Sequence, residues 1–309
     1  MPPPRLLMNE QDQPVVVGLG ELLWDIFPDL KRPGGAPANV AFQAEQLGCR
    51  GVVCSRVGRD RLGDELLRFL AEQGLSTASI QRDSLHPTGT VTVDARRADH
   101  PDYVIHENVA WDHIALDEDL KRLAGRAAAI CFGTLAQRLP TSRATIQQAL
   151  AEVSPRCLIV YDVNLRQHWY DRTRIEASLA KAHCVKLNSD EVLVLAELLQ
   201  IGTPDHVSLA KAIRQRFDVD VVCITRGAEG CLMVGPDAVV DRPGVAVEVA
   251  DAVGAGDAFT AAWIHARLLA WPLEAQAAFA NEVGALVASR PGAMPPLRDE
   301  LAAVAKRFP

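Results

Sequence analysis

The 309-residue sequence lacks the features that mark several common protein classes. No run approaches the roughly 18 apolar residues that a membrane-spanning helix needs. The N-terminal stretch MPPPRLLMNEQDQP lacks the apolar core of a secretory signal. There is no block of basic residues, and the formal net charge of −7 argues against nucleic acid or an anionic membrane as the main partner. We therefore expect a cytoplasmic protein that acts on a small molecule.

Cysteine motifs are also missing. The seven cysteines are odd in number, contain no C-x-x-C pair and mostly lie within apolar runs. This pattern favours buried thiols in a reducing compartment over a disulfide framework or a zinc site. The residues are Cys49, Cys54, Cys131, Cys157, Cys184, Cys223 and Cys231.

From Val15 onward the sequence alternates short β-branched runs with helical patterns. Such alternation is typical of βαβ units around a buried, mainly parallel sheet. With 49% hydrophobic residues, the length favours one large α/β domain with an accessory piece. The expected strands span residues 15–24, 128–135, 157–164, 183–188, 220–227 and 231–235. The expected helices span residues 38–48, 63–74, 142–153, 174–182, 190–200, 207–217, 257–270 and 273–289.

Residues 88–111 interrupt this alternation. They hold two β-rich stretches around a polar turn, which predicts a hairpin. Together with residues 24–33, the hairpin is expected to form a small sheet that projects from the main domain as a lid. A plain surface hairpin is the alternative.

The stretch VEVADAVGAGDAFTAAW carries the strongest chemical signal. Asp257 stands at the start of a helical pattern, where an acid is commonly a cap. The preceding Gly254-Ala255-Gly256 lets backbone N–H groups approach an anion at the positive end of that helix. A carboxylate would repel the same anion unless it acts as a base that takes a proton from a hydroxyl group. The pattern therefore favours a base beside a phosphoryl cradle.

The stretch LKRPGGAPANVAF places two glycines ahead of a helix. Gly34 and Gly35 permit close approach of a ligand, whereas Asn39 at a helix start is commonly only a cap. Asp25 lies between two apolar runs, where a carboxylate either caps a turn or binds a polyol. Both interpretations stay open on these residues alone.

Two stretches later in the chain are equally ambiguous. Asn188 and Glu191 lie at i and i+3 of a helix that follows a strand, so they form either a cap or a site for a hydrated magnesium ion beside a triphosphate. Gly227 and Gly230 separate two strand-like runs, which fits a hairpin or a backbone that follows a nucleotide.

A polar cluster ends the apolar run before residue 162. Asp162, Asn164 and Arg166 are spaced by two and are expected to share one face of a strand end. Such a cluster suits a cleft, and an ion pair between Asp162 and Arg166 is the structural alternative.

In order along the chain, these motifs resemble the ribokinase-like, or PfkB, family of carbohydrate kinases. The matching residues are GG-x-x-x-N near residue 35, N-x-x-E at 188, T-x-G at 225 and DAVGAGD at 251. The stretches GELLWDIFP and DVNLR are most similar to the fructokinase-like branch. The resemblance implies a ribokinase-like three-layer α/β/α sandwich at residues 12–306, with a mainly parallel central sheet and a small β-sheet lid from residues 24–33 and 88–111.

The resemblance also implies roles for individual residues. Asp257 would be the catalytic base, with an anion hole formed by the backbone N–H groups of Gly254, Ala255, Gly256 and Asp257. The sugar would be bound by Asp25, Gly34, Gly35 and Asn39, with Arg166 as a weaker candidate. The nucleotide would be bound by Asn188, Thr225, Gly227, Gly230 and Asn281.

The implied cofactors are ATP and Mg²⁺, with K⁺ as a further candidate. Asn188 and Glu191 would arrange magnesium, in part through water, and Asp251 with the carbonyl of Val253 would form a monovalent-cation site. Ala252 departs from the family pattern, in which many members have threonine, so activation by the ion is left open.

The implied reaction is transfer of the γ-phosphoryl group of ATP to a primary hydroxyl, with fructose as the preferred acceptor. The alternative is 2-keto-3-deoxygluconate, whose carboxylate Arg166 could meet. Arg96 and Arg97 leave a phosphorylated sugar as an open alternative acceptor. The stretch CFGTLAQR lacks the acid with which ribokinases bind ribose, which disfavours ribose as the acceptor. A homodimer through the lid is a further expectation. A P-loop enzyme is excluded because the sequence has no Gly-Lys pair, and a protein kinase because it has no H-R-D or D-F-G.

Two other classes compete with a kinase. GAGDAF is part of G-x-G-x-x-G, and Glu274 follows Gly254 at the spacing of a dinucleotide-dependent oxidoreductase. In such an enzyme the acid ends a strand, whereas Glu274 lies in a helical pattern opened by Pro272. A noncatalytic binding protein on the kinase fold is disfavoured because Asp257, Asn188 and Glu191 are all present.

Overall fold

The computed structural model describes residues 13–94, 102–202 and 205–309, and it contains a large and a small β-sheet. The strands of the large sheet are β1 (Val15–Leu19), β4 (Arg50–Gly58), β5 (Ile80–Asp83), β8 (Ala129–Gly133), β9 (Leu158–Asp162), β10 (Cys184–Asn188), β11 (Val221–Thr225), β12 (Cys231–Val234) and β13 (Val239–Arg242). Those of the small sheet are β2 (Leu23–Ile26), β3 (Lys31–Gly34), β6 (Gly89–Asp94) and β7 (Asp102–Ile105). The helices are α1 (Ala36–Gln46), α2 (Arg61–Glu72), α3 (Glu118–Arg126), α4 (Pro140–Ala149), α5 (Arg172–Leu179), α6 (Ser189–Leu199), α7 (His206–Phe217), α8 (Ala255–Leu268), α9 (Leu273–Ala288) and α10 (Arg298–Ala305), with 3₁₀ turns at Ala110–His113, Leu135–Gln137 and Gly227–Glu229.

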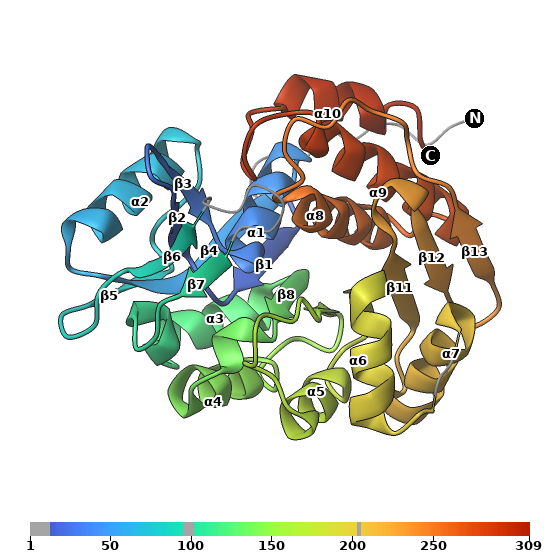
Figure 1. The fold of residues 1–309 in the computed structure, drawn as a ribbon, viewed down its shortest axis with the longest axis horizontal. Coiled ribbons are helices and arrows are strands. Elements are labelled where there is room, and N and C mark those ends of the chain that lie inside the picture. Colours follow the sequence, from blue (N-terminus) through green and yellow to red (C-terminus); the bar gives the residue numbers. More distant parts are fainter. Residues whose placement is uncertain (1–12, 95–101, 203–204) are drawn as a thin grey trace.

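The large sheet confirms the expected α/β class. Its strand order is β13-β12-β11-β10-β9-β8-β1-β4-β5. All neighbours from β11 to β5 are parallel, whereas β12 and β13 are antiparallel additions at one edge. Helices α1, α8, α9 and α10 lie on one side of this sheet and α3 to α7 on the other, which gives three layers (Figure 1).

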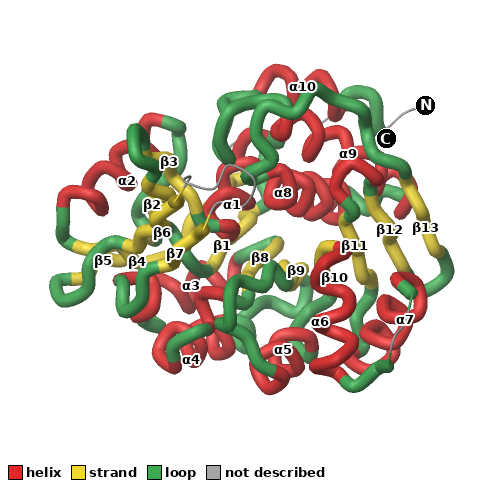
Figure 2. The backbone as a smooth tube through the Cα atoms, viewed as in Figure 1, coloured by secondary structure: helices red, strands yellow, loops and turns green. Residues whose placement is uncertain are grey.

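Two apolar cores follow from the pleat of the strands. Val17 and Leu19 of β1 point into the core beneath α3 to α7, while Val16, which precedes Val17, points into the core beneath α8 and α9. Successive side chains of a strand point to opposite faces, so a sheet covered on both sides needs continuous apolar runs. Figure 2 shows helices on both sides of the strands.

The small sheet joins two strands from residues 23–34 to two strands from residues 89–105. Its strand order is β3-β2-β6-β7, with β2 parallel to β6 and the other neighbours antiparallel. The hairpin residues Arg96 and Arg97 lie outside the described part of the chain. In Figure 1 the small sheet stands beside α1, at one side of the layered domain.

Some sequence-based boundaries were wrong or incomplete. The single strand expected at residues 15–24 is two strands in two sheets, because the chain leaves β1 after Leu19 and enters the small sheet at Leu23. Strand β4 had no prediction, since Arg50, Ser55 and Arg56 interrupt its apolar run. Helices α3 and α10 were also missed. Within the described ranges, no helix has the length and apolar character of a membrane span.

Candidate active site

A cavity of about 1360 Å³ lies at the carboxyl ends of the parallel strands, between the small sheet and the start of α8. This is the edge at which open α/β sheets bind ligands. Most of the predicted site residues line it, namely Asp25, Gly35, Asn39, Arg166, Asn188, Thr225, Gly227, Gly230, Val253, Gly254, Ala255, Gly256, Asp257 and Asn281. Gly34, Glu191 and Asp251 are not part of its lining.

The N-terminus of α8 presents backbone donors to this cavity. Gly254 is the N-cap with φ 81°, and a Cβ there would come within 2.5 Å of Ala293, so the turn requires glycine. The N–H of Ala255 is used, because it donates to Ala252 at 3.3 Å. Within the described chain, the N–H groups of Gly256 and Asp257 donate to no protein acceptor. These two groups are therefore available to an anion.

Asp257 is the third residue of α8, so its side chain is not the cap that precedes the helix. Its Oδ2 instead accepts a hydrogen bond from Asn39 Nδ2 at 2.7 Å. Burial, and next the charge of Asp162, raise the pKa of Asp257 to about 6, although Lys186 opposes the shift. The carboxylate is thus mostly ionised at neutral pH. Its pKa is close enough to neutral pH for it to accept a proton from a hydroxyl group.

Asn39 is also not a cap. Helix α1 begins at Ala36 with Gly35 as its N-cap, which places Asn39 one turn inside the helix. Its side chain is buried, and its Oδ1 has no hydrogen-bond partner in the described structure. Because its amide donates to Asp257, Asn39 orients the carboxylate from the neighbouring helix α1.

A buried lysine beneath the α8 terminus was missed by sequence reasoning. Lys186 Nζ lies 3.0 Å from Asp162 Oδ2, and a Cβ at Gly256 would lie 3.2 Å from the same nitrogen. Thr260 donates to Asp162 at 3.1 Å. Despite burial, the charges of Asp162 and Asp257 hold the pKa of Lys186 well above its usual value. The cavity lining therefore contains a permanent positive charge beside the N–H groups of α8.

These contacts contradict both the shared strand face predicted for Asp162, Asn164 and Arg166 and the alternative ion pair between Asp162 and Arg166. Strand β9 ends at Asp162, and Asn164 adopts φ 41°, so the polar residues do not share one strand face. Arg166 is exposed at the cavity and forms no ion pair within the described ranges. A signal was available, since Asp162 and Lys186 each stand in apolar strand runs where a charge needs a partner.

Glu21 is a second residue that sequence reasoning missed. It lies between β1 and β2, lines the cavity and is only 3% exposed. Its Oε2 has no hydrogen-bond partner in the described structure. Burial, reinforced by the charge of Asp257, raises the pKa of Glu21 to about 7. An acid inside the apolar run GLGELLW was the signal in the sequence.

Asp25 faces the cavity from the small sheet. Burial raises its pKa to about 6, against the opposing charges of Arg166 and Arg32. Gly34 explains how the carboxylate fits, because a Cβ at that position would lie 2.6 Å from Asp25 Oδ2. Gly34 therefore makes room for a polar group without lining the cavity itself.

Asn188 and Glu191 form a capping box at the start of α6. Asn188 Oδ1 accepts from the N–H of Glu191 at 3.0 Å, and Glu191 Oε2 accepts from the N–H of Asn188 at 2.8 Å. Glu191 Oε1 accepts from the N–H of Leu165 at 2.6 Å. The structural alternative is thus realised, and Glu191 joins α6 to the loop after β9. Among the described residues, no group of three His, Cys, Asp or Glu side chains could hold a metal ion.

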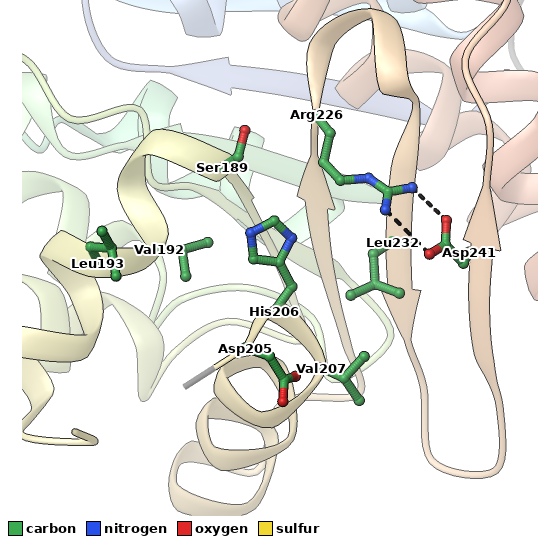
Figure 3. Close-up of a pocket in the computed structure, with 9 residues that line it drawn as sticks. All are labelled: Ser189, Val192, Leu193, Asp205, His206, Val207, Arg226, Leu232 and Asp241. Carbon is green, nitrogen blue, oxygen red and sulfur yellow. Dashed lines mark hydrogen bonds and ion pairs between the residues drawn. The ribbon is translucent and has the colours of Figure 1, made fainter. Parts of the chain in front are cut away.

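The hairpin of β11 and β12 forms the far end of the cavity through Thr225, Gly227 and Gly230. Arg226 fixes this hairpin, because its guanidinium is hydrogen-bonded to Asp241 of β13 (Figure 3). From α9, Asn281 Nδ2 donates to the carbonyl of Pro243 at 3.1 Å. At this end of the cavity, the hydrogen bonds of Arg226 and Asn281 hold the backbone segments that form the lining.

Asp251 lies in the loop that leads to α8. Its Oδ1 accepts from the N–H of Val253 at 3.0 Å, and its Oδ2 from the N–H of Gly292 at 3.1 Å. Arg32 of β3 also donates to Oδ2. The carboxylate therefore connects the small sheet to the loop before the α8 terminus.

Comparisons with known proteins agree with this arrangement. The sequence profile of the pfkB family carbohydrate kinases matches residues 29–300. An uncharacterized sugar kinase of Pyrococcus horikoshii is 32% identical, over 93% of this chain and 94% of its own length. A fructokinase of Vibrio alginolyticus is 29% identical, over 89% and 93%.

Solved structures extend the similarity to three dimensions. The crystal structure of the Pyrococcus horikoshii protein in complex with ATP matches with a TM-score of 0.80 at 29% identity, covering 94% of this chain and 97% of that one. Two crystal structures of fructokinase from Vibrio cholerae match at 25% identity with a TM-score of 0.80, covering 96% of this chain and 99% of that one. One holds fructose, ADP and calcium, and the other, of a double mutant, holds fructose, ADP and potassium.

Proposed function

The chain belongs to the pfkB family of carbohydrate kinases, which are phosphotransferases with an alcohol group as acceptor, and we propose that it transfers the γ-phosphoryl group of ATP to a primary hydroxyl of fructose. The observation that carries this proposal is the placement of Asp257. A carboxylate with a raised pKa stands beside unpaired N–H groups of a helix terminus, and Asn39 of the adjacent helix α1 orients it. A base and an anion cradle in one place suit a hydroxyl that attacks a phosphoryl group.

The acceptor is expected between α8 and the small sheet. Asp25, Glu21 and Asn39 place polar oxygens on that side of the cavity, where sugar hydroxyls need hydrogen-bond partners. Asp257 takes the proton of the attacking hydroxyl as the new bond to phosphorus forms and the bond to the leaving ADP oxygen breaks. The N–H groups of Gly256 and Asp257 stabilise the charge on the transferred group.

ATP is expected to extend from α8 toward the hairpin of β11 and β12. Lys186 supplies a positive charge near the phosphoryl group, and Thr225, Gly227, Gly230 and Asn281 line the remaining length. The described residues suit a hydrated magnesium ion held mainly by phosphate oxygens, since both oxygens of Glu191 already accept backbone hydrogen bonds. When bound with the nucleotide, magnesium neutralises negative charge on the phosphate oxygens.

The small sheet is proposed to act as a lid. Its residues Leu23, Asp25, Phe27, Val91 and Ile105 line the cavity opposite the nucleotide end. Covering the acceptor would exclude water, which competes as phosphoryl acceptor. The homodimer through this sheet stays a prediction.

A sugar acid is the second candidate acceptor, because Arg166 is exposed at the cavity and forms no ion pair within the described ranges. A guanidinium without an ion-pair partner in the described structure could bind the carboxylate of 2-keto-3-deoxygluconate. Replacement of Arg166 by methionine separates the two acceptors. It should raise KM severalfold for the keto acid and leave KM for fructose nearly unchanged.

The main test replaces Asp257 by asparagine and follows ADP release over a panel of ketoses, aldoses, keto acids and nucleosides. We expect folding and ATP binding to persist while kcat falls by about 10² to 10⁴, the usual contribution of a positioned base. Glu300→Gln is the matched control, because Glu300 is an exposed acid at the same position of α10. Near-normal turnover in the Asp257 variant would refute the assignment.

A further inference from the structure

Arg32 reaches from the small sheet to the loop that precedes α8. In the β2–β3 pair, Arg32 lies opposite Asp25, and both side chains line the cavity. The guanidinium donates to Asp251 Oδ2, a residue 219 positions later in the chain, and lies 5.6 Å from the centre of the Phe27 ring. A charge carried by the small sheet is thereby fixed three residues before the α8 cap.

The carboxylate of Asp251 has little remaining capacity for a ligand. Its side chain is 16% exposed and already accepts hydrogen bonds from Val253, Gly292 and Arg32. The two backbone contacts hold the loop that turns into Gly254, and so they set the direction of the N–H groups at the start of α8. The third contact supplies the positive charge that balances the carboxylate.

These residues do not fit the monovalent cation expected at Asp251 and Val253. A cation on the same carboxylate would lie beside the guanidinium, and two like charges at such close range repel each other. Ala252 adds no hydroxyl ligand. A potassium ion is bound in the crystal structure of the double mutant of Vibrio cholerae fructokinase.

We infer that the Arg32 guanidinium takes the place of a monovalent cation at Asp251 and holds the anion cradle of α8 in position. Arg32 is a positioning residue in this assignment, since it acts through Asp251 and the loop to Gly254. Arg32 belongs to β3, so the small sheet itself carries this charge to the loop. The consequence for catalysis rests on the proposed phosphoryl transfer.

The first test measures the cation directly and needs no turnover. Crystals of the wild type and of Arg32→Met are soaked in rubidium chloride, and rubidium, which substitutes for potassium, is located by its anomalous scattering. We expect no rubidium at Asp251 in the wild type and bound rubidium there in the variant. Rubidium beside Asp251 in the wild type, or none in a folded variant, would overturn the inference even if the proposed reaction proved wrong.

The second test uses kinetics in tetramethylammonium buffer with and without potassium or guanidinium chloride. Wild-type kcat should stay within about twofold in all buffers. Arg32→Met should lose about tenfold or more in kcat without added ion, as expected for energetic coupling between sites, and recover with potassium or guanidinium. Lys31→Met is the matched control, because Lys31 lies next on β3 but pairs with Glu65 outside the cavity. A loss that neither ion restores indicates a purely structural pair and contradicts the inference.

Discussion

Replacement of Asn39 by aspartate tests whether Asp257 is the base that titrates in catalysis. The substitution keeps the shape of the side chain and exchanges a hydrogen-bond donor 2.7 Å from Asp257 Oδ2 for a second carboxylate. In the wild type, activity should be lost as the pH falls through about 6, because a protonated Asp257 cannot accept the hydroxyl proton.

The expected displacement follows from the geometry. Two carboxylates with charge centres about 4 Å apart repel by about 4 kcal/mol at a dielectric constant of about 20, and about 1.4 kcal/mol corresponds to one pH unit. Sharing of the proton and local relaxation reduce this effect, so we expect the acid limb of the kcat profile to move up by at least about two pH units. At pH 7 the variant should have about a tenth of wild-type kcat, and it should recover at about pH 9.

The assay is the pH dependence of kcat, measured by coupled detection of ADP at saturating acceptor. Asn39→Ala is the control, since it removes the same hydrogen bond without adding a charge and should move the limb by about one pH unit or less. The reasoning fails if the limb of Asn39→Asp stays near pH 6, or if both variants shift equally.

Three other predictions concern buried groups. Burial raises the pKa of Glu21 from 4.5 to about 7, so the folded wild type binds a proton more tightly than the unfolded chain and loses stability as the pH rises through that window. In urea unfolding, the stability of Glu21→Gln relative to the wild type should increase by about 2–3 kcal/mol between about pH 4.5 and pH 8. An equal stability difference at both pH values contradicts this prediction. Gly254→Ala places a Cβ 2.5 Å from Ala293 at a residue with φ 81°. This variant should lower the free energy of unfolding by about 1–3 kcal/mol and kcat by about tenfold or more, and thermal unfolding and turnover equal to those of the wild type would refute the close approach. Arg138 forms a buried ion pair with Asp112 at 2.7 Å, so Arg138→Met leaves the Asp112 carboxylate buried without its partner. In chemical denaturation this variant should lose about 3–5 kcal/mol in the free energy of unfolding, and the double variant with Asp112→Asn should regain part of it. A loss under about 1 kcal/mol would show that the pair is solvated.

Local patterns were sufficient to predict the α/β class, whereas most of the residues that line the cavity were named through the resemblance to the PfkB family. The alternation of apolar runs and helical patterns reports directly on a sheet covered on both sides, because each pattern depends on residues close in sequence. The small sheet was also predictable, since the region around residue 90 broke the alternation. What failed were boundaries that depend on the rest of the fold, such as the change from β1 to β2.

The chemistry within the site was less accessible from sequence. Asn39 and Asp257 both resembled caps, because an Asn or Asp near a helix start is normally one, and only the docking of α1 against α8 shows that they contact each other. Lys186 and Asp162 stand on neighbouring strands, so their pairing depends on strand order. The contact between Arg32 and Asp251 joins two distant segments, and no local pattern encodes it.

The 218-residue separation between Asn39 and Asp257 has a consequence for the timing of biosynthesis. At about 5–20 residues per second, a ribosome needs about 10–40 seconds to add that length of chain. Throughout this interval the nascent polypeptide carries Asp25 and Asn39, which we propose to bind the acceptor, without the carboxylate that would activate a hydroxyl. Competence to consume nucleotide thus arises only when the last helices have emerged, and appearance of activity in a synchronised translation reaction would report completion of the whole domain.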